Sequence, residues 1–144
     1  MITYQKTEDL SASAKITFVN MRSYYEHYSV DWDCEKIEQQ IYDLINFDIL
    51  LNGEIVGAIR LAFDNDGCYI RDLQVSEQFQ SKGIGALALA ECERLAIDSG
   101  VNTLKLRVFK ISPAFHLYKR VGFVLDHSDD RFYNMSRTIT KKTI

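Results

Sequence analysis

The stretch from Cys68 to Ser99 constrains the fold most, because a strand, a glycine loop and a helix follow one another there. Cys68–Val75 is strand-like, and Gly83 and Gly85 open a long amphipathic helix. The first N–H groups of a helix have no partner inside it and lie at the positive end of its dipole, so they favour an anion. Glycine lets a phosphate approach the backbone, and Lys82 adds a positive charge. We therefore predict a phosphate-binding loop, although glycines at a helix start are also compatible with a purely steric role.

The run from Gly83 to Ala88 also fits the G-x-G-x-x-A pattern of dinucleotide-binding proteins. That pattern requires the glycines directly after a strand and an acidic residue about 20 positions later. Seven residues separate Val75 from Gly83, and the next predicted strand, Thr103–Phe109, carries lysine and arginine instead of an acid. A nicotinamide-dependent oxidoreductase is therefore disfavoured, and the loop is of another kind.

Apolar periodicity and turn residues predict the other elements and an α/β (α+β) chain. A helix from about Ser13 to His27 is followed by one that Asp33 caps and whose apolar side runs to Ile45. The helix from Gly83 to Ser99 is expected to bury Ile84, Leu87, Ala88, Cys92, Leu95 and Ala96. Ser112-Pro113 starts a short helix that Gly122 ends. The predicted strands are Ile2–Lys6, Phe47–Leu51, Glu54–Phe63, Cys68–Val75, Thr103–Phe109, and a closing hairpin of Phe123–Asp126 with Arg131–Thr138.

Two motifs in this order resemble the GCN5-related N-acetyltransferase (GNAT) family. Gln80-x-x-Gly83-x-Gly85 is similar to its acetyl-CoA loop, and the run from Ala114 to Phe123 is similar to its A-x-x-L-Y-x-x-x-G-F segment. The resemblance covers about Ile55 to Phe123. It implies a single domain over residues 1–144 with a mixed, mostly antiparallel central sheet flanked by helices. The strands that hold Val75 and Val108 would splay apart and admit the pantetheine arm of acetyl-CoA.

The resemblance also implies which residues bind the cofactor, acetyl-CoA. Backbone N–H groups of the loop would hold the pyrophosphate, namely those of Gln80, Ser81, Lys82, Gly83, Ile84, Gly85 and Ala86. The pantetheine and thioester would lie along Leu73, Gln74 and Val75, with further contacts from Ser112 and Ala114. An asparagine that commonly precedes the second motif in this family is absent here, because Ile111 and Ser112 occupy its place.

The resemblance assigns the catalytic roles to Tyr118 and Asp72. Tyr118 matches the tyrosine that often protonates the departing sulfur. A phenol, with a pKa of about 10, keeps its proton at neutral pH and can donate it to a thiolate, whose pKa is about 8.5. A tyrosine that anchors the short helix on the sheet is the alternative. Asp72 is the candidate general base, directly or through water. A salt bridge with a neighbouring basic residue would also explain the presence of Asp72. In that case water alone would serve as the general base.

The acceptor pocket is expected near Tyr24, Tyr28 and Trp32, although these side chains also fit a packed aromatic corner. The function implied is transfer of an acetyl group from acetyl-CoA to a primary amine. Small amines, polyamines, antibiotics and peptide N-termini all remain open as acceptors. The alternative function is a non-catalytic module that binds acyl-CoA and regulates a partner.

Composition excludes several other classes. The net charge is −3 and no Lys/Arg run with interleaved aromatic residues occurs, which argues against nucleic-acid binding. No apolar run approaches the roughly 20 residues of a membrane span, and the N-terminus lacks an apolar signal region, so we expect a cytoplasmic protein. Three widely spaced cysteines form neither a disulfide framework nor a zinc pattern, and no metal is expected. A homodimer is left open.

Overall fold

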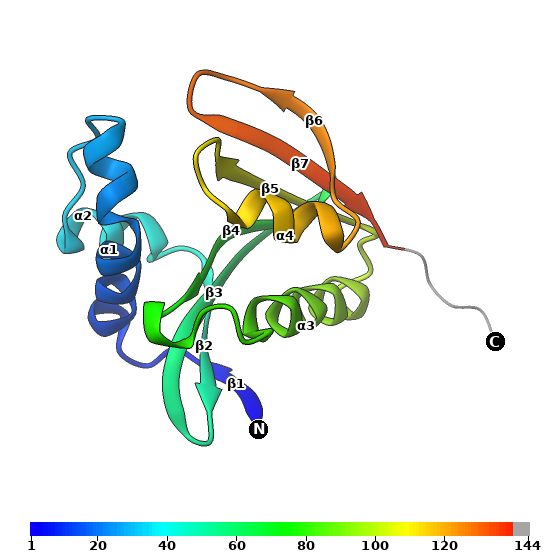
Figure 1. The fold of residues 1–144 in the computed structure, drawn as a ribbon. Coiled ribbons are helices and arrows are strands. Elements are labelled where there is room, and N and C mark those ends of the chain that lie inside the picture. The colour runs from blue at the N-terminus through cyan, green and yellow to red at the C-terminus, as the bar shows by residue number, and fades with distance from the viewer. Residues whose placement is uncertain (140–144) are drawn as a thin grey trace.

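One seven-stranded sheet organises the protein in the computed structural model, which describes residues 1–139 (Figure 1). The strand order is β1-β2-β3-β4-β5-β7-β6, and every neighbouring pair is antiparallel except β4 with β5. The predicted mixed, mostly antiparallel sheet flanked by helices is confirmed. In chain order the elements are β1 (Ile2–Lys6), α1 (Leu10–His27), α2 (Cys34–Ile41), β2 (Ile45–Leu51), β3 (Glu54–Asp64), β4 (Gly67–Val75), the short 3-10 helix η1 (Glu77–Phe79), α3 (Ile84–Asp98), β5 (Thr103–Phe109), α4 (Ala114–Arg120), β6 (Val124–Ser128) and β7 (Phe132–Thr138).

Several element boundaries differ from the sequence prediction by a few residues, and two of these differences have a clear physical cause. Helix α1 begins at Leu10 rather than near Ser13, because the Asp9 side chain caps it by accepting a backbone N–H in the first turn. Strand β2 already begins at Ile45, although the apolar spacing predicts this residue on the buried side of the preceding helix. Ile45 instead pairs with Leu61 of β3 and is 41% exposed. A short apolar run suits a helix and a strand equally well. Pairing with β3 therefore decided that Ile45 belongs to a strand.

Helix α3 buries four of the six residues of the predicted stripe, while Leu95 is half-buried and Leu87 is exposed. Ala88 and Cys92 are fully buried, but Leu87 is 52% exposed and Leu89 is buried instead. At 100° per residue, Leu87 lies about 120° around the helix from the line through Ala88 and Cys92. Gly100 has a positive φ of 79° just after the helix, as expected of a residue that ends one.

The helices cover both faces of the sheet. Arg60 of β3 contacts Ser13 of α1, whereas its neighbours Ile59 and Leu61 share a hydrophobic cluster with residues of α3. Because successive side chains of a strand point to opposite faces, α1 and α3 lie on opposite sides of β3. In Figure 1, strands β2 and β3 run between α1 on the left and α3 on the right. A second, smaller core of Ala14, Ile37 and Ile41 joins α1 to α2.

Strands β4 and β5 pair over a short stretch and then separate (Figure 1). The parallel ladder joins Cys68–Ile70 to Leu104–Leu106 and ends there. Directly beyond it, Arg71 is an extra residue in β4, which shifts the register against β3. Such a bulge bends the strand that contains it and increases its twist. The predicted splay between the strands of Val75 and Val108 is confirmed.

The C-terminal half follows the prediction closely. The Ser112 hydroxyl accepts the Ala114 N–H at 3.2 Å, so Ser112 caps α4 although the helix itself begins at Ala114. Gly122 has a φ of +99° where the chain leaves this helix. The closing hairpin is formed by β6 and β7. A single domain over residues 1–144 stays a prediction, since residues 140–144 lie outside the described part.

Two searches of residues 1–139 gave negative results. None of the helices there is long and apolar enough to cross a membrane. Nor does that part of the chain hold a group of three or more His, Cys, Asp or Glu side chains arranged to bind a metal ion.

The close approach of β3 to β4 at Gly57 gives a first prediction. A Cβ at Gly57 would lie 2.1 Å from the Gln74 carbonyl oxygen, which is backbone and cannot move aside cheaply. We expect Gly57→Ala to lower the free energy of unfolding by about 2 kcal/mol, measured by urea denaturation. Gly85→Ala is the control, because its Cβ would meet the end of the Leu117 side chain at 3.1 Å. Equal losses for the two variants would contradict the argument.

Candidate active site

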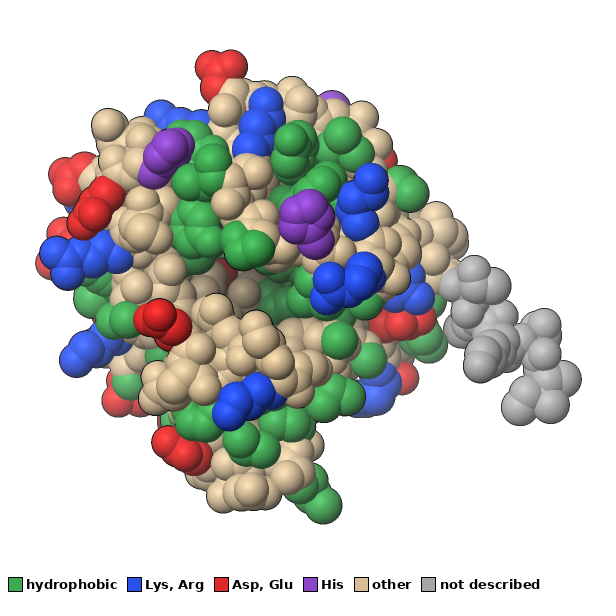
Figure 2. Space-filling model, in the orientation of Figure 1, with side chains coloured by type: hydrophobic (Ala, Val, Ile, Leu, Met, Phe, Trp, Pro, Cys, Tyr) green, Lys and Arg blue, Asp and Glu red, His purple; other side chains and the backbone are tan. Residues whose placement is uncertain are grey.

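A cavity of about 1110 Å³ opens where β4 and β5 separate. Its walls come from α1, the end of β4, the loop that leads into α3, the end of β5 and the start of α4. Figure 2 shows a hollow in the middle of this face of the molecule. The cavity therefore lies at the place that the splayed strands predicted.

Most of the residues predicted for the site line this cavity. Two do not: Lys82, which is exposed in the loop before α3, and Tyr28, near the end of α1. The predicted residues that do line it are Tyr24, Trp32, Asp72, Leu73, Gln74, Val75, Gln80, Ser81, Gly83, Ile84, Gly85, Ala86, Ser112, Ala114 and Tyr118. Segments far apart in the sequence thus meet at one cavity.

The end of β4 directs backbone groups into the split. The Ser76 N–H donates to the Val56 carbonyl of β3 at 2.8 Å. In an antiparallel pair, successive residues point their N–H and C=O alternately toward the partner and away from it, so Val75 points away from β3. Its carbonyl accordingly accepts from the side chains of Asn20 and Gln80, each at 2.8 Å. The Val75 N–H points the same way, toward β5, which no longer pairs with β4 at this level.

The loop before α3 presents a second group of backbone donors. Ser81 and Gly83 have positive φ values of 61° and 83°, which turn the chain sharply into the helix. The first backbone hydrogen bond of α3 runs from the Leu87 N–H to the Gly83 carbonyl at 3.2 Å. The N–H groups of residues 84–86 precede it and have no acceptor within the helix. Together with the helix dipole they form a site suited to a phosphate.

Tyr118 lies on α4 and reaches the cavity from a buried position. It is 8% exposed, and its ring packs edge-on against Phe123 with 5.9 Å between the centroids. Burial, and to a lesser extent the negative charge of Asp72, raises the pKa of Tyr118 well above its ordinary value of 10. The phenol therefore keeps its proton at neutral pH and can act only as a donor or an acceptor of hydrogen bonds, or as an acid.

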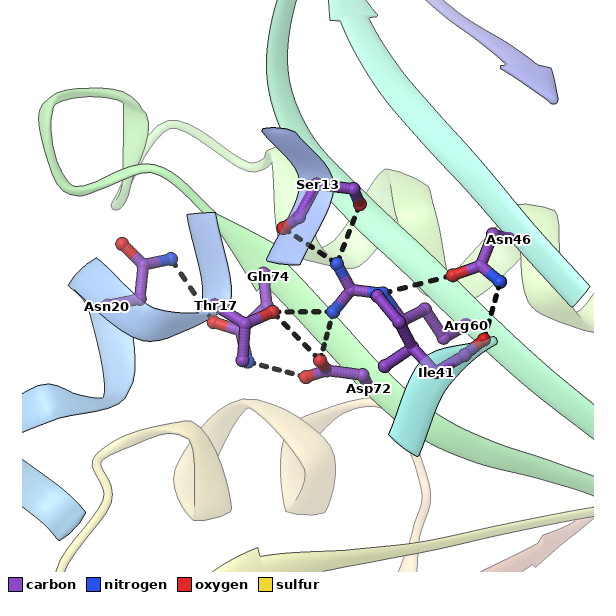
Figure 3. A network of polar contacts seen from close by, with 8 residues as sticks. All are labelled: Ser13, Thr17, Asn20, Ile41, Asn46, Arg60, Asp72 and Gln74. Atoms are coloured by element: carbon purple, nitrogen blue, oxygen red, sulfur yellow. Dashed lines mark hydrogen bonds and ion pairs between the residues drawn. The ribbon is translucent and has the colours of Figure 1, made fainter. Parts of the chain in front are cut away.

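Asp72 forms an ion pair with Arg60 of the neighbouring strand (Figure 3). Its Oδ2 also accepts from the Thr17 hydroxyl at 3.0 Å, and its Oδ1 accepts from Gln74 Nε2 at 2.5 Å. Both oxygens are thus engaged by protein donors. The salt bridge that we considered as the alternative role for Asp72 is present.

Arg60 is the residue of this network that the sequence reasoning missed. It is completely buried, and its other N–H groups donate to the Ser13 carbonyl and hydroxyl at 2.8 and 2.6 Å and to Asn46 Oδ1 at 3.1 Å. An isolated charged residue inside the apolar run from Ala58 to Ala62 was the available signal. A buried charge requires a partner, so this pattern predicts an ion pair but not which acid supplies it.

The aromatic residues near the end of α1 form both a packed corner and part of the cavity wall. Tyr24 and Tyr28 stack on the ring of Phe109, at 5.5 and 5.1 Å between centroids. The Tyr24 hydroxyl lies 3.5 Å from the Ser112 hydroxyl. Trp32 packs at a tilt against Tyr25, and both line the cavity. Whether Tyr24, Tyr28 and Trp32 contact an acceptor stays a prediction.

Comparison with known proteins gives a family match and fold relatives. The family model described as "Acetyltransferase (GNAT) family" matches residues 9–123. The chain is 28% identical over 85 residues to streptothricin acetyltransferase of Streptomyces lavendulae, covering 57% of this chain and 45% of that protein. It is 32% identical over 90 residues to an uncharacterized N-acetyltransferase of Chlorobaculum tepidum, covering 62% and 54%. The chain therefore spans about half the length of the curated relatives it matches.

The solved structures show the same fold. A GNAT family acetyltransferase from Elizabethkingia anophelis, with acetyl-CoA bound, superimposes with a TM-score of 0.76 at 18% identity. The match covers 96% of this chain and 98% of that one. At this level of identity the likeness concerns the fold.

The buried ion pair gives a second prediction. Asp72→Ala would leave the Arg60 guanidinium buried without its carboxylate, so we expect the free energy of unfolding to fall by about 3–5 kcal/mol. Urea denaturation measures it. The control is Asp98→Ala, which removes the acid from a solvent-exposed salt bridge with Arg94 and should therefore change the stability far less. A loss for Asp72→Ala as small as that of the control would mean that Arg60 is not held by this pair.

Proposed function

The chain belongs to the acetyltransferase (GNAT) family, and from this premise we propose that it transfers an acetyl group from acetyl-CoA to a primary amine. The observation that carries the proposal is the position of the Val75 N–H. This donor points into the split between β4 and β5, beside the loop whose free N–H groups suit a phosphate. One cavity thus combines a site for the charged part of the coenzyme with a donor for its reactive carbonyl.

The residues around the cavity fit the coenzyme. Acetyl-CoA would supply an acetyl group activated as a thioester. We assign its pyrophosphate to the backbone N–H groups from Gln80 to Ala86, where the helix dipole favours negative charge. The pantetheine arm would lie in the split along Leu73 and Val75, with Ser112 and Ala114 on the other wall.

Two groups of the chain then act on the reacting atoms. The Val75 N–H donates to the thioester oxygen, and a fixed donor aimed at an oxygen that gains negative charge lowers the barrier. Tyr118 holds its proton on the phenol oxygen, because burial raises its pKa, and gives it to the departing sulfur.

The amine must reach the carbonyl without its proton. Both oxygens of Asp72 already accept hydrogen bonds from Arg60, Thr17 and Gln74. We therefore propose that water removes the amine proton and that Asp72 contributes by holding the network in place.

The acceptor we propose is a small molecule or a peptide that carries a primary amine. One curated relative is named a streptothricin acetyltransferase, so streptothricin belongs in the first panel of amines tested, beside other amine-bearing small molecules. A cytoplasmic location, the absence of nucleic-acid and membrane partners, and the oligomeric state stay predictions.

A non-catalytic module that binds acyl-CoA is the second candidate. It is favoured by one observation, which is that Ile111 and Ser112 stand where the family commonly has an asparagine that contacts the cofactor. Release of free thiol from acetyl-CoA over a panel of antibiotics, polyamines, aryl amines and peptides separates the two. Thiol release with any amine supports the enzyme, and coenzyme binding without release supports the module.

Gly83 gives a prediction for cofactor binding. Its φ of +83° is strained for any residue with a Cβ, although nothing lies within 4 Å of that position. We expect Gly83→Ala to distort the loop and weaken CoA binding about tenfold in calorimetry. Gly100→Ala is the matched control, since Gly100 follows the other end of the same helix with a φ of +79° and equally open surroundings. Similar weakening in both variants would argue against binding at the loop.

Tyr118 gives a prediction for chemistry. Tyr118→Phe should lower kcat at least about tenfold, because it removes a positioned acid, while the Kd for CoA changes little. Tyr42→Phe is the control, since Tyr42 is 73% exposed and lies outside the cavity. Thiol release with the best acceptor of the panel measures the effect. Unchanged turnover would remove Tyr118 from the mechanism.

A further inference from the structure

One asparagine of α1 connects the helix to the end of β4. Asn20 Nδ2 donates to the Val75 carbonyl at 2.8 Å and to Gln74 Oε1 at 3.1 Å. The amide nitrogen of an asparagine carries two hydrogens, so both of its donors are used. The Val75 N–H belongs to the peptide bond between Gln74 and Val75. Asn20 thus contacts the residues on both sides of this bond.

The peptide group that follows Val75 is held at both ends. Its carbonyl accepts from Asn20 and from Gln80, and its N–H, which belongs to Ser76, donates to the Val56 carbonyl of β3. A peptide group is planar, so these contacts at opposite ends leave it little freedom to rotate. This restraint matters because β5 does not pair with β4 at this level and cannot fix the backbone itself.

The restraint continues into the buried ion pair (Figure 3). Gln74, which accepts from Asn20, donates in turn to Asp72, and Asp72 is paired with the fully buried Arg60. The position of Asn20 is therefore tied to the fully buried guanidinium of Arg60.

We propose that Asn20 is a positioning residue for acetyl transfer: by holding Gln74 and the Val75 carbonyl, it aims the Val75 N–H at the thioester oxygen. The proposal rests on the proposed function, which assigns that N–H to the thioester. Asn20 also lines the cavity, but both hydrogens of its amide nitrogen are engaged by Gln74 and Val75, so it acts through β4.

Asn46 provides a matched comparison at the other end of the same network. Its Nδ2 donates to the carbonyls of Ile41 and Leu44, and its Oδ1 accepts from Arg60 Nε. Like Asn20, it uses both hydrogens of its amide nitrogen to bridge two acceptors, but it lies outside the cavity. Loss of Asn46 therefore reports what a merely structural asparagine contributes.

The test uses the full chain with Asn20→Ala, Asn20→Asp and Asn46→Ala. Asn20→Asp keeps the shape but replaces the donor nitrogen by an acceptor oxygen, so it should disturb the Val75 carbonyl more than alanine does. With the best amine of the panel, we expect kcat to fall about tenfold to a hundredfold in Asn20→Ala and further in Asn20→Asp. The Kd for CoA should stay within about twofold, because the pyrophosphate site is elsewhere. Asn46→Ala should lower kcat much less than Asn20→Ala does, because Asn46 contacts Arg60 and the chain after α2 but not β4.

Amide hydrogen exchange at Ser76 in the free protein is the readout that does not need turnover. Faster exchange in Asn20→Ala than in wild type or Asn46→Ala is expected, since local opening at the end of β4 becomes easier. Equal kcat losses in Asn20→Ala and Asn46→Ala, or unchanged Ser76 exchange in Asn20→Ala, would overturn the proposal. Wild-type protein that binds acetyl-CoA but acetylates no amine would refute the proposed function instead, and Ser76 exchange would still decide whether Asn20 holds β4.

Discussion

The separation of β4 from β5 after Ile70 is the constraint on which the rest of the site depends. A strand that loses its neighbour exposes backbone donors and acceptors, and in most proteins these must be paired or solvated. Here the bulge at Arg71 coincides with the end of the parallel ladder. The split thus supplies both the cavity and the free N–H of Val75, so a single irregularity in the sheet accounts for the space and for the chemistry.

A free strand end needs support from elsewhere, and the polar network behind β4 provides it. The charge of Arg60 lies fully buried, which is costly unless each of its donors finds a partner. Five contacts to Ser13, Thr17, Asn46 and Asp72 satisfy it, and within residues 1–139 no buried side-chain nitrogen or oxygen lacks a partner. An apolar residue in place of Arg60 would still pack α1 against the sheet. It would not hold β4 in one position, because it makes no directional hydrogen bonds.

Local sequence rules predicted much of the fold. Gly100 and Gly122 mark helix ends because their backbone conformation suits few other residues, and both have positive φ values in the structure. Side-chain burial was less predictable. Leu87 is exposed although its spacing looked apolar, and Ile45 joined a strand rather than a helix, because neighbouring elements decide which side of an amphipathic segment is covered.

The sequence by itself determined the order of the elements, the glycine loop at the start of α3 and the presence of Tyr118 after β5. These features depend on contacts between near neighbours, so they can be read from spacing. Only the tertiary structure decided that Arg60 pairs with Asp72, and that Asn20 reaches Val75 from 55 residues away. Such pairs depend on how α1 packs across β3 and β4, and a partner brought close by folding leaves no local pattern in the chain.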